Sequence, residues 1–130
     1  MAKYLSPEWI DELDRAAQAS DLVRAAAPDL VFVVEHEVTG LPEGTVRYHI
    51  AFDRGSARLR SGGAPDPDAC FTEDVETAVA VCSGAINAQS AFMSGRLRVR
   101  GDMDKLIAAQ PAIEALDVAL EEPRARTTYA

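Results

Sequence analysis

The stretch Ala85–Leu106, AINAQSAFMSGRLRVRGDMDKL, carries the signals of a helix, a strand and a second helix in close succession. Asn87 can accept an otherwise unpaired backbone N–H at the start of a helix over 88–93. Gly95 ends that helix because glycine adopts the left-handed conformation at low steric cost. From 96 to 100, arginine alternates with leucine and valine, which is typical of a strand with one wet and one buried face. Asp102 can then cap a following helix.

The apolar side chains of this stretch recur at the spacing that each of these elements requires. Side chains that share the buried face of neighbouring elements pack into one core. We therefore expect one apolar centre that contains Phe92, Met93, Leu97, Val99, Met103, Leu106 and Ile107.

A longer pattern runs through the same stretch, and its members are Asn87, Gln89, Phe92, Gly95, Arg96, Leu97, Val99, Gly101, Asp102 and Met103. In this order it resembles the lipid-binding domain of the sterol carrier protein 2 family, where an Asn/Asp-x-Gln-x-x-Phe helix precedes Gly-Lys/Arg, an alternating strand and Gly-Asp-Met. The resemblance covers about residues 7–120; in the first half, the order of the elements is more similar than the residues themselves. It implies an α/β (α+β) domain with a twisted five-stranded sheet, helices over one face and an apolar tunnel. It also implies lipid binding without catalysis.

Length and composition fit a single domain over 1–130, with a core of about 7–120 and a tail of 121–130. The net charge of -8 disfavours nucleic acid as a partner, and it also disfavours stable anchoring to an anionic membrane. Cys70 and Cys82 form neither a CxxC pair nor a zinc motif, so we expect two reduced thiols and no cofactor. With no apolar signal region, no membrane-spanning run and no peroxisomal address in TTYA, we expect a cytoplasmic protein.

The first half of the chain predicts a helix followed by three strands. Ser6 and Pro7 are typical of a helix start, and the apolar stripe of the helix runs to about residue 19. Alternating apolar residues predict strands over 30–39, 45–52 and 57–60, joined as a meander. We expect opposite charges on the outer face of these strands, where Glu35 and Glu37 meet Arg47 and Arg58.

The glycines and prolines of 61–68 predict a loop, and a short strand over 69–72 follows it. Glu73 and Asp74 open the next helix, which ends at Gly84. Pro111 opens a further helical segment that ends near Glu121. We expect the polar segment Arg124–Ala130 of the tail to be loose, while the family resemblance also allows a C-terminal segment to close over the tunnel.

His36 shares a predicted strand face with apolar residues, where an imidazole needs a partner. It is open to three interpretations. The first is a satisfied core pair with Tyr48 or a backbone carbonyl, and the second is a polar handle for a ligand hydroxyl or carboxylate. The third is a general base, which ranks lowest because the sequence offers no nucleophile, metal motif or phosphate loop beside it.

We therefore expect a non-catalytic binder of a lipid or other hydrophobic ligand, such as a fatty acyl group, an acyl-CoA or a sterol-like molecule. The expected ligand-binding residues are Phe32, His36, Tyr48, Phe52, Phe71, Val79, Phe92, Met93, Met103, Ile107, Ile113 and Leu116. An alternative is a cavity-less module that docks on a lipid- or steroid-metabolising enzyme, which exposed apolar side chains around Trp9 and the last helix would favour. A small enzyme that uses His36 is the third alternative.

Overall fold

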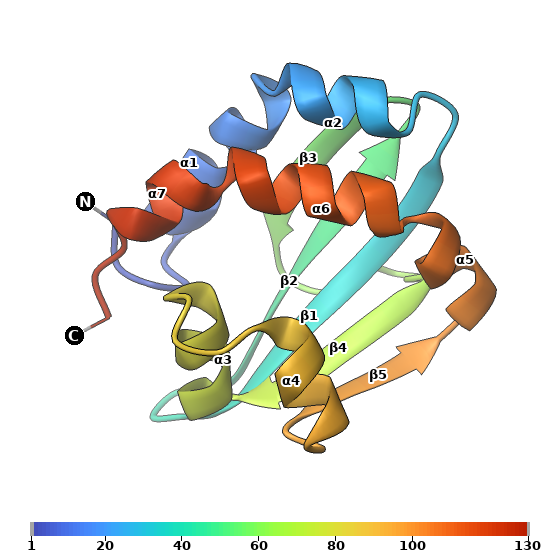
Figure 1. Ribbon diagram of the computed structural model, residues 1–130. Coiled ribbons are helices and arrows are strands. Elements are labelled where there is room, and N and C mark those ends of the chain that lie inside the picture. Colours follow the sequence, from blue (N-terminus) through green and yellow to red (C-terminus); the bar gives the residue numbers. More distant parts are fainter. Residues whose placement is uncertain (1, 130) are drawn as a thin grey trace.

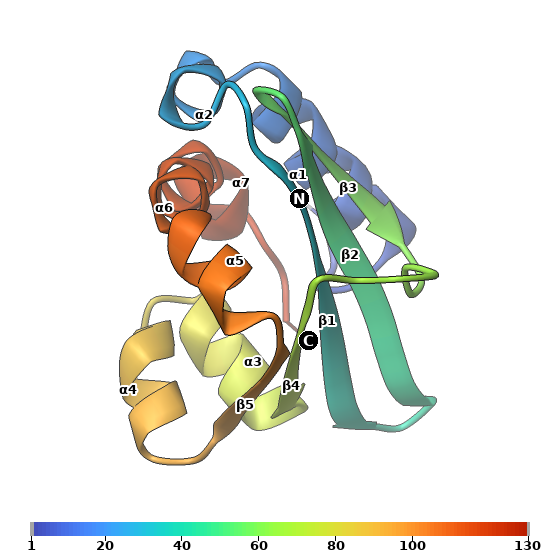
Figure 2. The same ribbon diagram turned by 90° about the vertical axis from the view of Figure 1, so that its right-hand side faces the viewer.

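Alternating apolar residues build a five-stranded sheet with the strand order β3-β2-β1-β4-β5. The computed structural model describes residues 2–129 (Figures 1 and 2). The strands are β1 (Val31–Leu41), β2 (Gly44–Asp53), β3 (Ser56–Ser61), β4 (Ala69–Asp74) and β5 (Leu97–Gly101). Strands β1, β2 and β3 form the predicted antiparallel meander, whereas β4 pairs parallel to β1 and antiparallel to β5. The sheet is therefore mixed.

Side-chain caps fix several helix starts. Ser6 accepts the backbone N–H of Trp9 at 3.2 Å, and Asn87 accepts that of Ser90 at 2.7 Å. Both caps confirm the sequence prediction. The helices are α1 (Pro7–Gln18), α2 (Asp21–Ala26), α3 (Val75–Cys82), α4 (Ala88–Met93), α5 (Met103–Ala108), α6 (Gln110–Ala119) and α7 (Glu121–Ala125). The short helix α2 has no counterpart in the sequence prediction.

The helices cover one face of the sheet, while α1 runs along the edge strand β3 (Figure 2). Asp14 joins α1 to this edge strand, because its carboxylate accepts the backbone N–H of Leu59 at 2.9 Å and the Nε–H of Arg58 at 3.0 Å. An unpaired edge N–H is thereby satisfied. Arg58 pairs with Asp14 rather than with the expected glutamates of β1.

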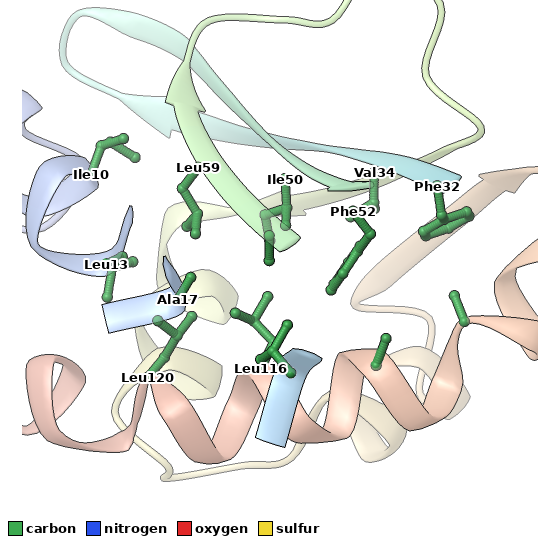
Figure 3. Close-up of a cluster of buried hydrophobic side chains, with 14 of the residues drawn as sticks. Ile10, Leu13, Ala17, Phe32, Val34, Ile50, Phe52, Leu59, Leu116 and Leu120 are labelled. Atoms are coloured by element: carbon green, nitrogen blue, oxygen red, sulfur yellow. The ribbon is translucent and has the colours of Figure 1, made fainter. Parts of the chain in front are cut away.

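The opposite face of the sheet is polar, as expected. Arg47 pairs with Glu37 at 2.9 Å and lies 3.9 Å from Glu35. The apolar face carries the core, where Ile50, Phe52 and Leu59 point from the sheet toward Leu116 of α6 (Figure 3). The predicted fold class is confirmed by this arrangement.

The prediction of a loose tail is wrong for the part of the tail that the structure describes, which ends at Tyr129. Residues Glu121–Ala125 form α7, and Thr127 Oγ1 accepts the indole N–H of Trp9 at 3.0 Å. The backbone N–H of Tyr4 donates to the carbonyl of Thr128 at 2.8 Å. The buried Trp9 indole needs an acceptor that α1 does not supply, and the returning tail provides it. Residues 1 and 130 lie outside the described part.

Candidate functional site

A cavity of about 920 Å³ lies between the apolar face of the sheet and the helical layer. Its sheet wall comes from the inward residues of the five strands, namely Val34, His36, Tyr48, Ile50, Phe52, Leu59, Phe71, Glu73 and Leu97. Its other walls come from α1, the second half of α6, α7 and the connection between α3 and α4. A space of this size matches the range of about 300–1,000 Å³ that is usual for sites of small-molecule ligands.

The cavity occupies one end of the space between the two layers. At the other end Phe32, Ala109 and Ala112 have no exposed surface, and none of them lines the cavity. Along α6 the packing changes after Ala112, because Ile113 and Leu116 border the cavity. Small side chains at a helix contact permit close approach of the backbone, so the first half of α6 closes its end of the domain.

The structure brings half of the predicted ligand-binding residues together around this cavity: His36, Tyr48, Phe52, Phe71, Ile113 and Leu116. Phe32 belongs to the closed core beside it, and Val79 of α3 is half-buried without lining the cavity. The remaining four predicted residues lie on the surface.

The expectation of one apolar centre in the stretch 85–106 and just beyond is wrong for these four side chains. The exposed fractions are 52% for Phe92, 78% for Met93, 41% for Met103 and 69% for Ile107. Both short helices flank β5 at the edge of the sheet, where neighbours exist on one side only. In α4 the small Ala91 is the buried residue, so the larger side chains beside it face outward.

His36 lines the cavity and stacks on Tyr48, with ring centroids 4.8 Å apart and an interplanar angle of 2°. The two rings contact through their faces, so the first of the three interpretations, a satisfied core pair with Tyr48, is wrong. Within residues 2–129, Nδ1 of His36 is buried without a hydrogen-bond partner. Burial lowers the pKa of His36 to about 4, with a smaller contribution from the positive charge of Arg124, so the imidazole is neutral at pH 7.

Glu73 is a cavity residue that the sequence prediction missed. The prediction places it at a helix start, but it belongs to β4, where it pairs with Val38 of β1 and Leu97 of β5. The alternation of Ala69, Phe71 and Glu73 is the signal that could have placed its side chain on the inward face. Glu73 is only 9% exposed. Burial, and then the charge of Asp74, raise its pKa to about 7.

Arg124 of α7 also lines the cavity, and the sequence prediction missed it by placing it in a loose tail. Its guanidinium donates to Asp117 at 3.2 Å. Its Nε is buried without a partner among the described residues. The polar groups His36, Glu73 and Arg124 thus share a cavity whose other sheet-side walls are mainly apolar.

The model of the SCP-2 sterol transfer family matches residues 10–114. The chain belongs to this family. A crystal structure of sterol carrier protein 2 is similar to the chain with a TM-score of 0.72 and 21% identity, over 95% of this chain and 98% of that one. The SCP-2 family resemblance in the sequence is therefore confirmed.

Two further solved structures share the fold. The solution structure of a conserved hypothetical protein from Thermus Thermophilus has a TM-score of 0.71 and 20% identity, over 98% of this chain and 92% of that one. The solution structure of palmitated SCP2L2 from Aedes aegypti has a TM-score of 0.61 and 21% identity, over 85% of this chain and 94% of that one. A comparison with curated proteins gave no match.

Two negative findings apply to residues 2–129 of this SCP-2 family chain. No helix there is long and apolar enough to cross a bilayer. No group of three or more His, Cys, Asp or Glu side chains in that range is arranged to hold a metal ion.

Proposed function

We propose that the chain binds and carries a lipid or other hydrophobic ligand in the cavity under α6, without catalysing a reaction. The observation that carries this proposal is the cavity of about 920 Å³ with apolar walls from both layers. Family membership supports lipid binding in general, and the Aedes aegypti relative was solved in a palmitated form.

The apolar walls supply sufficient free energy for such binding. Each buried methylene contributes about 0.8 kcal/mol, so a sixteen-carbon chain contributes roughly 12 kcal/mol before the costs of association and ordering. We expect a dissociation constant in the micromolar range or below for a fatty acyl, acyl-CoA or sterol-like ligand. The proposed wall residues are the predicted residues that border the cavity, namely His36, Tyr48, Phe52, Phe71, Ile113 and Leu116.

A matched pair of substitutions on α6 tests the proposal. Ile113→Trp places a large ring in the cavity, whereas Val118→Trp adds the same ring to an exposed position on the same helix. Titration with a fluorescent fatty acid and with a fluorescent sterol should show saturable binding to the wild type and to Val118→Trp. Ile113→Trp should bind at least about tenfold more weakly to whichever probe the wild type binds. Absence of saturable binding of both probes to the wild type would refute the carrier function.

A docking module is the second candidate, because Phe92, Met93 and Ile107 are exposed at one edge of the domain. The sequence prediction locates the docking side chains around Trp9 and the last predicted helix; Trp9 is instead 2% exposed, whereas Val118 on that helix is 50% exposed. The variant Phe92→Ser with Met93→Ser separates the two candidates. A carrier keeps its affinity for the lipid probe in this variant. A cavity-less module binds no probe, and loses binding to a purified lipid- or steroid-metabolising enzyme when these residues are changed.

We also propose a cytoplasmic location. The two cysteines, Cys70 and Cys82, are unpaired, which is usual for proteins of a reducing compartment. Fractionation of cells that express the tagged chain tests this location.

A further inference from the structure

The polar side chains that line the cavity include more acidic than basic groups. Glu73, Asp117 and Glu121 line it with carboxylates, and Arg124 is the cation among the lining residues. Arg124 already donates to Asp117 at 3.2 Å, so its positive charge is partly neutralised. A bound carboxylate would therefore meet an excess of negative charge rather than a free cation.

Above about pH 7, where it is mainly ionised, Glu73 contributes most to this excess because it is the least hydrated of the three carboxylates. Glu73 is 9% exposed, whereas Asp117 and Glu121 are exposed. On the neighbouring strands it stands between Val38 and Leu97, which offer no hydrogen bond from a side chain. A charge in such surroundings is poorly screened, and it repels a second anion strongly.

The groups that face Glu73 come from several elements. Tyr48 of β2, Cys82 of α3 and Tyr4 before α1 each lie close enough for the charge of Glu73 to raise their pKa values. These neighbours are uncharged at pH 7, since burial raises the pKa of each. Asp74, the next residue along β4, adds a further negative charge.

Two polar atoms of the cavity wall, in the part of the chain that the structure describes, are free to form hydrogen bonds with an uncharged ligand group. Nδ1 of His36 and Nε of Arg124 are both buried and lack partners within the described residues. A buried polar atom without a partner destabilises the folded state, and a ligand that supplies the missing partner removes that cost. A ligand hydroxyl both donates and accepts, and it adds no charge that the carboxylates would repel.

We propose, on the basis of the carrier function above, that this polar end selects the ligand by its head group. It binds amphiphiles with an uncharged hydroxyl more tightly than those with a free carboxylate, and the ionised Glu73 is the residue responsible for the difference. The apolar walls hold the tail of either class, so the discrimination resides in the head group alone.

The test compares two probes with the same twelve-carbon tail, 1-dodecanol and dodecanoate, by titration calorimetry at about pH 8. The wild type should bind dodecanol at least about tenfold more tightly than dodecanoate. Glu73→Gln should gain about tenfold in affinity for dodecanoate and stay within about twofold for dodecanol. Glu76→Gln removes the same charge from a more accessible position on α3, outside the cavity, and should match the wild type for both probes.

The outcomes separate the two proposals. Equal binding of both probes to the wild type overturns the head-group inference and leaves the carrier function standing. A change of equal size for both probes in Glu73→Gln, or an equal gain for dodecanoate in Glu76→Gln, also overturns it. No binding of either probe to the wild type or to Glu73→Gln contradicts the carrier function, and the head-group inference with it.

Discussion

Glu73→Gln removes a buried negative charge while it keeps the size and shape of the side chain, so it measures the cost of ionising this residue in the folded state. Burial and the neighbouring charge of Asp74 raise the pKa of Glu73 from its ordinary 4.5 to about 7. A raised pKa means that the folded state binds the proton more tightly than the unfolded state does. The associated stability is fully present below about pH 4.5 and is lost as the pH rises through about 7.

The size of the effect follows from this shift. The difference between 4.5 and about 7 corresponds to about 3 kcal/mol at most, and hydration of the open cavity reduces it to roughly 1–2 kcal/mol. At about pH 8 we therefore expect Glu73→Gln to be more stable than the wild type by roughly 1–2 kcal/mol. At about pH 4 the difference should shrink to within roughly 0.5 kcal/mol, because the wild-type carboxyl is then mainly protonated in the unfolded state as well as in the folded state.

Urea unfolding at both pH values measures these differences. Trp9 is the single tryptophan and is buried, so its fluorescence reports the transition. The gain at about pH 8 corresponds to a shift of roughly 0.5–1 M in the urea midpoint. His36 titrates in the wild type and the variant alike, and it cancels in the comparison. A variant that is less stable at about pH 8, or that differs equally at both pH values, would refute the assignment of a buried, destabilising charge.

Three further predictions concern other parts of the domain. Gly101→Ala should destabilise by roughly 3 kcal/mol or more in thermal unfolding, because a Cβ there would lie 2.3 Å from the carbonyl oxygen of Asp68 and the residue has a φ of +120°; unchanged melting would contradict this. Asp14→Ala should lower the unfolding free energy by roughly 1–3 kcal/mol, since it leaves the edge of β3 unpaired, and Glu12→Ala on the same helix is the control. The unfolding free energy of His36→Phe relative to the wild type should rise as the pH falls from 6.5 towards 4, because the lowered pKa of His36 makes its protonation favour the unfolded state; a difference that does not change with pH would exclude this role.

Local signals in the sequence were sufficient to predict most of the fold. Caps act over three residues, so Ser6, Asn87 and Asp102 could be recognised from the chain alone. The meander was predictable because turn residues separate runs of alternating apolar residues. The parallel pairing of β4 with β1 depends on contacts between segments far apart in the sequence, and nothing local encodes them.

The cavity was less predictable than the fold, because an inward side chain can belong to a packed core or to a cavity wall with the same sequence pattern. Phe32 and Phe52 are paired on neighbouring strands and face the same layer, yet only Phe52 lines the cavity. Arg124 could not be assigned to the site without knowing that Thr127 accepts the Trp9 indole N–H and draws the tail back over the sheet. Phe92 and Met93 had the spacing of core residues, but a helix at the sheet edge has few neighbours to bury them.

The position of the cavity follows from the distribution of residue size along α6. Ala109, which directly precedes α6, and Ala112 are fully buried, so the first half of this helix lies close to the sheet at Phe32. Ile113 and Leu116 follow at the point where the space opens, and no side chain from α6 fills it completely. A buried glutamate in a central part of a packed sheet would require a paired cation. Glu73 is tolerated because its carboxylate faces the open part of the layer, and the same space makes a lipid ligand possible.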